Sequence, residues 1–232
     1  MIRKIFGFTI GEVLIALGVI GIIAMLTIPQ IINGRQATEA KSAFNTAYSI
    51  ISNTITEMDA NNVSILPTSY TSTQNSFSDE IIKYQKVVEK CNPQDSSICY
   101  TSSEYKQLNG NAMNINFSKS YVLNNGMLIA IQNESGTTNK NGKEIPKPIF
   151  IAVDINGKMN PPNRMGIDFF IFELTSEGLM PSGGAGTFYE TPTSGTPTDS
   201  DCNITAMTGS GKTCAARALA EESYFVTIHK NH

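Results

Sequence analysis

Glu12 is the residue whose chemistry most needs an explanation, because it is a carboxylate inside an apolar run. Residues 8–28 are otherwise apolar apart from glycines and two threonines. An acid near the edge of an apolar span is costly unless it is paired or neutralised, so it is a functional candidate. The nearest basic side chains in sequence are Lys4, behind it, and Arg35, about six helical turns ahead. A cut just before Phe8 would therefore create the best available cation, a new N-terminal ammonium.

The four cysteines fall into two local pairs, Cys91 with Cys99 and Cys202 with Cys214. In an exported protein this arrangement predicts two disulfides, and of the possible connectivities we prefer nearest-neighbour pairing, because each bond closes its loop within a hydrophilic segment. A zinc site is the alternative. It needs ligands in tight pairs, whereas the chain has no Cys-x-x-Cys, and its two histidines lie at the tail.

Asp154, Asn156 and Asp168 are candidate metal ligands. Asp154-Ile155-Asn156-Gly157 opens like an oxygen-ligand loop for calcium, and Asp168 lies where a second carboxylate returns to the same point. An ordinary turn is the alternative, because Asx-Gly pairs form turns without a metal. The acidic ligands are sparse and no bidentate glutamate closes the loop, so calcium is a hypothesis and no cofactor is required.

Two further patterns raise the question of catalysis. AMTGSGKT, residues 206–213, fits the permissive form of a phosphate-binding loop, with alanine in place of the first glycine. A working loop follows a buried strand and has a magnesium-binding acid on a later strand. This segment instead follows polar residues close to the end of the sequence. The only imidazole bases, His229 and His232, lie in the tail, so we expect no enzyme activity.

A long N-terminal element must position these residues. At about 1.5 Å per residue, residues 8–28 just span a hydrocarbon core of about 30 Å. Arg3 and Lys4 precede the span, so the positive-inside bias leaves the first residues in the cytoplasm and sends everything after Pro29 outward. A secretory signal peptide is the alternative, but no small-residue cleavage site follows the apolar run.

Residues 29–60 continue as an amphipathic helix. Apolar residues recur there at steps of three and four, the spacing of one helix face. They are Ala37, Ala40, Phe44, Tyr48, Ile51, Ile55 and Met58. An anchor that runs directly into such a helix is expected to be retained and not removed.

The N-terminal residues Gly7-Phe8-Thr9-Ile10-Gly11-Glu12 resemble the class III leader of type IV prepilins and of type II secretion pseudopilins. The shared features are a basic leader, glycine before the scissile bond, phenylalanine after it and glutamate at the fifth mature position. Pro29 also falls where this family places a helix-bending proline. Independently of the resemblance, proline in a helix interior removes a backbone donor, which predicts a bend near Ala24 and Met25.

The resemblance implies that a prepilin peptidase cuts between Gly7 and Phe8 and methylates the new amine. It implies a leader 1–7, a transmembrane helix 8–28, the helix 29–60 and an exported head 61–232. The implied partners are the inner membrane lipid, an inner-membrane assembly platform and other copies of the chain. Some major pseudopilins hold calcium in a late loop, so the resemblance favours the calcium hypothesis at Asp154. The implied location is the inner membrane, with the head periplasmic or extracellular after assembly.

The head is expected to be an antiparallel sheet packed on the C-terminal half of the long helix, a pilin-like α+β fold. Residues 79–90 predict a short helix, and strands are predicted at 121–123 and 127–131 around Asn124-Asn125-Gly126, at 148–154, at 168–174 and at 224–228. Three to five of these strands would form a meander.

The overall charge argues against a nucleic-acid-binding protein. Lys and Arg number 17 against 20 Asp and Glu, so nucleic acid is not expected as the main partner. We interpret the chain as a structural subunit of a type IV pilus or of a secretion pseudopilus. The alternative is a minor pilin that acts as an adhesin or DNA-uptake module at the filament tip.

Overall fold

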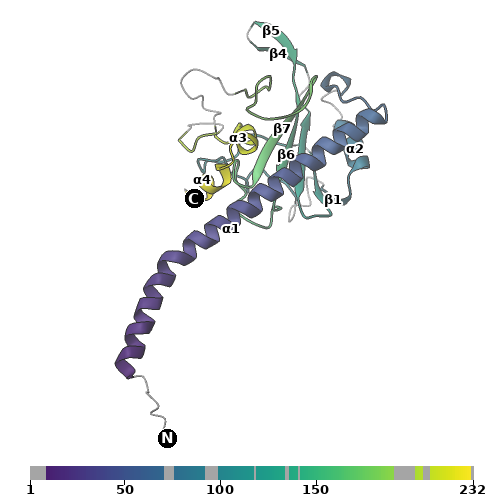
Figure 1. The fold of residues 1–232 in the computed structure, drawn as a ribbon. Helices are drawn as coiled ribbons and strands as arrows, with labels where there is room; N and C mark the ends of the chain where they lie inside the picture. Colours follow the sequence, from purple (N-terminus) through teal and green to yellow (C-terminus); the bar gives the residue numbers. More distant parts are fainter. Residues whose placement is uncertain are drawn as a thin grey trace.

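The computed structural model describes residues 9–70, 76–91, 99–117, 119–133, 136–140, 142–190, 202–205 and 210–230. The expected leader 1–7 and the first expected mature residue, Phe8, lie outside these residues. The fold is α+β, with one long helix laid across an antiparallel sheet (Figure 1).

The helix α1 (Ile10–Ala60) is continuous over 51 residues, which corresponds to about 76 Å. Its N-terminal part projects from the head and its C-terminal part crosses the sheet (Figure 1). The apolar face predicted from sequence is confirmed, because Phe44, Ile51 and Met58 are buried. Ala47 joins them, while Ala40 and Tyr48 are half-buried at the edge of the same face.

The other helices are short. They are the 3-10 helices η1 (Pro67–Ser69) and η2 (Ile82–Tyr84) and the α-helices α2 (Ser76–Ile81), α3 (Cys214–Ala220) and α4 (Tyr224–Lys230). The strands are β1 (Val87–Cys91), β2 (Lys119–Leu123), β3 (Leu128–Asn133), β4 (Thr137–Lys140), β5 (Lys143–Pro146), β6 (Ile149–Asp154), β7 (Phe169–Thr175) and β8 (Gly178–Pro181).

In the described part of the chain, six strands form one sheet in the order β1-β2-β3-β6-β7-β8, with every neighbouring pair antiparallel. The predicted hairpin at Asn124-Asn125-Gly126 is confirmed, and Gly126 takes the positive φ of +86° that its turn requires. The strands β4 and β5 form a separate two-stranded ribbon that stands away from the end of α1 that projects from the head (Figure 1).

Both faces of the sheet are covered, so the head has two apolar clusters. On one face, the Phe44 ring of α1 lies 4.7 Å from the ring of Phe170 and 5.8 Å from that of Phe172. On the other, Phe169 packs against Tyr105, from the segment 99–117 that covers this face. All six residues of β6 are buried, which explains why its sequence is apolar without alternation.

Two predicted elements are wrong in part or whole. The helix predicted at 79–90 ends early, because Gln85 is extended and residues from Val87 onward pair with β2 as an edge strand. The strand predicted at 224–228 is the helix α4. Its consecutive Tyr224 and Phe225 are both buried, which a helix permits and an alternating strand does not. The sheet also exceeds the expected meander, because β1 and β8 extend its two edges.

Candidate functional site

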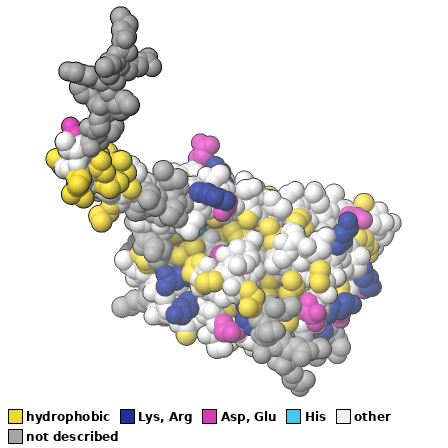
Figure 2. All heavy atoms as spheres, turned by 90° about the horizontal axis from the view of Figure 1, so that it is seen from below, with side chains coloured by type: hydrophobic (Ala, Val, Ile, Leu, Met, Phe, Trp, Pro, Cys, Tyr) yellow, Lys and Arg dark blue, Asp and Glu magenta, His cyan; other side chains and the backbone are white. Residues whose placement is uncertain are grey.

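The projecting part of α1 is the largest exposed apolar feature of the described chain. Within the described residues, one helical stretch, Ile10–Thr27, is long and apolar enough to cross a membrane, and none of it is buried against the head. Figure 2 shows hydrophobic side chains gathered on this projection, whereas charged side chains are dispersed over the visible face of the head. The helix therefore has an apolar surface that the head does not cover.

Glu12 lies at the start of this helix and is held by Thr9. Its carboxylate accepts hydrogen bonds from the Thr9 backbone N–H (2.8 Å) and the Thr9 hydroxyl (2.9 Å). In return the Glu12 backbone N–H donates to the Thr9 hydroxyl at 3.3 Å, which completes a capping box. The sequence analysis considered only cationic partners for Glu12 and missed Thr9, although the Thr-x-x-Glu spacing is a known helix start signal.

The two residues of the expected cleavage site, Gly7 and Phe8, lie outside the described residues. Pro29 lies inside α1, where it leaves the carbonyl of Met25 without its usual backbone donor. Figure 1 shows α1 curving along its N-terminal, purple half.

The structure brings Asp154 and Asp168 together at the end of β6 and the start of β7. Both are buried, and the backbone N–H of Ile155 donates to the Asp168 carbonyl at 2.9 Å. The Tyr105 hydroxyl donates to Asp154 Oδ2 at 2.6 Å, and the backbone N–H groups of Asn156 and Gly157 donate to Oδ1. Tyr105 was not predicted, because it lies 49 residues before its partner.

Asp168 closes the loop between the two strands. Its carboxylate oxygens accept from the backbone N–H groups of Asn163 (2.8 Å) and Arg164 (2.6 Å). Burial raises the pKa of Asp154 to about 6, and burial together with the nearby Asp154 charge raises the pKa of Asp168 to about 7. The backbone donors oppose these shifts without cancelling them. The two acids therefore titrate near neutral pH while they hold the 155–167 loop.

Asn156 is adjacent to this pair, but its side-chain amide donates to the backbone carbonyl of Asn160 at 2.8 Å. Among the described residues, no three His, Cys, Asp or Glu side chains are grouped to hold a metal ion. Every carboxylate oxygen of Asp154 and Asp168 accepts at least one hydrogen bond from the protein, which is how turn-forming residues behave. A calcium ion at this loop stays a prediction.

An open groove of about 570 Å³ lies between α1 and the 155–167 loop. Ala40 and Ala43 line it from α1, Pro161 and Pro162 from the loop, and His229 from α4. Asp168 also reaches the groove, so the loop that it fixes forms one wall.

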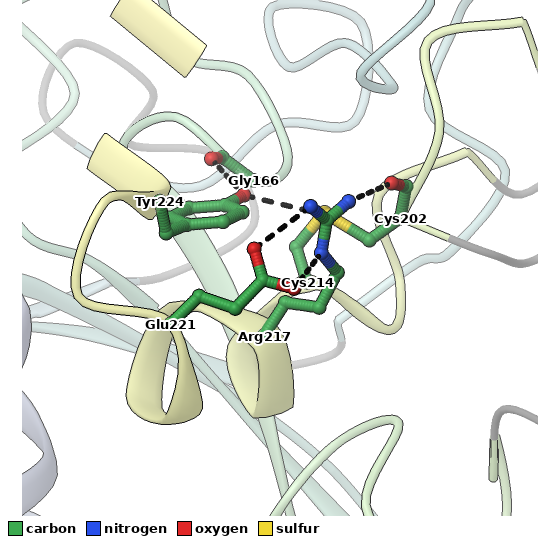
Figure 3. A network of polar contacts seen from close by, with 6 residues as sticks. All are labelled: Gly166, Cys202, Cys214, Arg217, Glu221 and Tyr224. Atoms are coloured by element: carbon green, nitrogen blue, oxygen red, sulfur yellow. Dashed lines mark hydrogen bonds and ion pairs between the residues drawn. A yellow bond between two sulfur atoms is a disulfide. The ribbon is translucent and has the colours of Figure 1, made fainter. Parts of the chain in front are cut away.

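The disulfide Cys202–Cys214 anchors the C-terminal helices, as Figure 3 shows. The Tyr224 hydroxyl donates to the Gly166 carbonyl at 2.6 Å, and Arg217 donates to the Cys202 carbonyl at 3.1 Å while it pairs with Glu221. The fit is tight, since a Cβ added at Gly166 would lie 2.7 Å from the Cys214 sulfur. These contacts tie α3 and α4 to the loop that carries Asp168.

The second disulfide, Cys91–Cys99, joins the end of β1 to the segment that covers the outer face of the sheet. Both bonds join neighbouring cysteines, as we expected, and with all four cysteines paired the zinc alternative has no thiolate ligands.

Ser210 and Gly211, from the segment that fits the phosphate-binding pattern, make packing contacts with the head. Residues 206–209 lie outside the described residues. Ser210 is buried, and its backbone N–H donates to the Gln107 side chain at 3.1 Å. The backbone of Gly211 lies against Met165 and Leu108, where a Cβ would lie within 2.6 Å of Met165. Ser210 and Gly211 thus pack against the head, with Gly211 at a close contact.

Glu173 is a buried acid in β7 that sequence analysis missed inside the apolar run of that strand. Its carboxylate accepts from the Ser182 hydroxyl at 2.7 Å and from the backbone N–H groups of Phe188 and Tyr189. It therefore holds the segment 182–190 against the sheet.

Comparison of the chain with protein-family models, with curated proteins and with solved structures gives no match.

Proposed function

We propose that this chain is a structural subunit of a helical filament that is assembled from a membrane, of the type IV pilin or type II secretion pseudopilin kind. The observation that carries the proposal is α1, a single helix with two different environments. Its first part is apolar and uncovered, and its second part is the central support of the head.

The uncovered apolar surface needs a partner of matching chemistry. Ile10, Leu14 and Met25 are 82%, 63% and 78% exposed, and exposed apolar side chains lie on every side of the helix in this stretch. Lipid meets this need before assembly, and other copies of the same helix meet it inside a filament. Self-association through Ile10–Thr27 is therefore the main contact that we propose.

Glu12, the single carboxylate of the stretch Ile10–Thr27, supports a processed N-terminus. A prepilin peptidase that cuts between Gly7 and Phe8 would leave an ammonium four residues before Glu12. In a bundle of such helices, the Glu12 of one copy can meet the Phe8 amine of a neighbour and fix the axial register. The capping box keeps the carboxylate at the helix start, where this meeting would take place.

The two disulfides of the head support an exported location. Two disulfides persist in oxidising compartments, and both loops that they close lie in the head. We propose that the chain sits in the inner membrane with its N-terminus inside, is delivered to an assembly platform, and serves as a structural component without catalysis.

The test is assembly of the full-length chain in cells that supply a prepilin peptidase and an assembly platform. We expect the sheared cell-surface or periplasmic fraction to contain filaments that an antibody to the head decorates. The matched control is Gly7→Arg, which changes the leader alone and should leave the chain uncut and unassembled. Processed wild-type chain that stays dispersed in the membrane would contradict the proposal.

A further inference from the structure

Four Asn-x-Ser/Thr triplets without a central proline occur in the head. They are Asn62-Val63-Ser64, Asn116-Phe117-Ser118, Asn133-Glu134-Ser135 and Asn203-Ile204-Thr205. In an exported protein this triplet is the acceptor pattern for an N-linked glycan. The pattern alone does not choose among the four, but the described residues of each triplet make different contacts.

In the triplet at Asn203, the third residue, Thr205, is hydrogen-bonded to the side-chain amide of the asparagine. Its Oδ1 accepts from the backbone N–H of Thr205 at 3.0 Å and from the Thr205 hydroxyl at 2.9 Å. The chain thus makes an Asx turn in which the hydroxyl contacts the amide oxygen. Both donors bind the oxygen, and no hydrogen bond to another described residue engages the amide nitrogen.

The contacts around Asn203 anchor the start of the triplet, and its second and third residues are exposed. Cys202 is tied to Cys214, and its carbonyl accepts from Arg217 at 3.1 Å (Figure 3). The carbonyl of Asn203 itself accepts from the Ser210 hydroxyl. Beyond these anchors, Ile204 is 45% exposed and Thr205 is exposed. The triplet therefore begins at an anchored, half-buried asparagine and ends at an exposed threonine.

The described residues of two other triplets are built into the fold. Phe117, the central residue after Asn116, is buried and meets the Tyr100 ring edge-to-face at 5.3 Å. Asn133 belongs to β3, where its backbone pairs with Ile149 of β6. A glycosyl transferase that binds the chain around either asparagine would have to break these contacts of the head.

The triplet at Asn62 is exposed but lacks the same turn. Asn62 takes a left-handed φ of +58° just after α1, and the Ser64 hydroxyl pairs with the Ser69 hydroxyl at 2.6 Å. The hydroxyl is thereby engaged away from its asparagine.

From this comparison we infer that Asn203 is the acceptor of an N-linked glycan. The donor class is an oligosaccharide carried on a lipid pyrophosphate. The bond from Asn203 Nδ2 to the sugar C1 forms as the bond from C1 to the pyrophosphate oxygen breaks. One amide proton passes to a base of the transferase, and the lipid pyrophosphate leaves. The reaction requires only that the head is exported, so it does not depend on filament assembly.

The experiment is to produce the full-length chain in cells that hold an oligosaccharyltransferase and its lipid-linked donor, together with a known glycoprotein acceptor as a positive control. Mass spectrometry of the intact chain and of its glycopeptides reads out the site. We expect one glycan, on the peptide that contains Asn203. The variants Asn203→Gln and Thr205→Ala should lose it, whereas Thr205→Ser should keep it.

The matched control is Asn62→Gln, an exposed asparagine in the same kind of triplet, which should leave the glycan in place. Disulfide mapping of Thr205→Ala shows whether the loop is still closed. An unmodified Asn203 in cells that glycosylate the control protein would overturn the inference, and so would a glycan that survives in folded Thr205→Ala.

Discussion

Glu12 has two possible partners, and they imply different roles. Within its own helix it completes the capping box with Thr9, which satisfies the carboxylate without any other chain. In an assembled bundle it would also meet the ammonium of a cut N-terminus. A capping box needs an acceptor oxygen, whereas an ion pair needs the negative charge. The two roles can therefore be separated by replacing the charge and keeping the oxygen.

We predict that Glu12→Gln and Glu12→Ala both sharply reduce filament yield while leader cleavage and membrane insertion continue. The glutamine retains a side-chain oxygen for Thr9 but cannot pair with an ammonium, and an apolar anchor inserts at least as well without the acid. The measurement is filament yield beside the fraction of processed, membrane-bound chain. Normal assembly of Glu12→Gln would mean that Glu12 acts only as a helix cap, and loss of cleavage would place its role in peptidase recognition.

The buried acids Asp154 and Asp168 predict that stability depends on pH. Their native pKa values, about 6 and about 7, lie above the ordinary value of 3.8. The native state therefore binds protons more tightly than the unfolded chain, so stability rises as the pH falls through 7 and 6. The gain levels off below about 3.8, where both states are protonated.

We expect the full-length chain in detergent to gain on the order of 4 kcal/mol between pH 8 and pH 5, which raises Tm by about 10 °C. Asp168→Asn should unfold at a lower temperature but with a flatter dependence on pH, because it removes one of the titrating groups. Thermal unfolding at both pH values checks the slope. A Tm that is unchanged, or that falls toward pH 5, would contradict the assignment.

At the scale of elements, Phe44 is the point where α1, the sheet and α4 meet. Its ring lies 4.7 Å from that of Phe170 and 5.7 Å from that of Phe225. Phe44→Ala should cost about 3–5 kcal/mol, the usual range for a buried phenylalanine. Denaturant unfolding measures it, with the exposed Thr46→Ala as control. A loss below about 1 kcal/mol would mean that α1 is not an integral part of the core.

The disulfides are the second test at this scale. Their sequence separations of 8 and 12 residues imply similar effects from loop closure, about 2–3 kcal/mol each. We predict a larger loss for the pair Cys202→Ser and Cys214→Ser than for Cys91→Ser and Cys99→Ser. Cys214 is fully buried and its bond anchors α3 and α4, whereas Cys91–Cys99 joins segments near the edge of the sheet. Equal losses would show that the contacts around Tyr224 add little.

Elements with a strong local pattern were predictable from the sequence, and elements defined by distant partners were not. The apolar face of α1, the hairpin at Asn124-Asn125-Gly126 and both disulfide pairings follow from local spacing. By contrast, β1 was predicted as helix, because its strand conformation depends on pairing with β2 across about 30 residues of chain. The helix α4 was predicted as a strand, because an apolar run this short has no clear period.

The same distinction holds for the candidate site. Asp154 and Asp168 were singled out as neighbours because each borders a predicted strand, and the antiparallel pairing brings them together. Tyr105 and Glu173 were missed. The hydrogen bond of Tyr105 is to Asp154, far along the chain, and that of Glu173 is to Ser182, in a loop without a motif. An ordinary turn at Asn156 was the alternative to the calcium hypothesis, and the Asn156 amide donates to the backbone carbonyl of Asn160.

At the scale of the whole molecule, the central feature is that the two parts of α1 have different surroundings. The part from Ile10 to Thr27 has an apolar surface that the head leaves uncovered, while the remainder is inseparable from the head that it supports. A membrane anchor with a merely tethered head would need no such continuity. A subunit that positions its head relative to its neighbours does need it, because one stiff helix transmits the packing of the anchor to the head.

The N-terminal peptide of assembled material tests this account most directly. Mass spectrometry of the chain recovered from sheared filaments should find a mature N-terminus at Phe8, with the mass of a methylated amine, and no peptide from residues 1–7. A chain in filaments that still begins at Met1, or that begins beyond Pro29, would contradict the proposal that Ile10–Thr27 is retained as the assembly helix of a processed subunit.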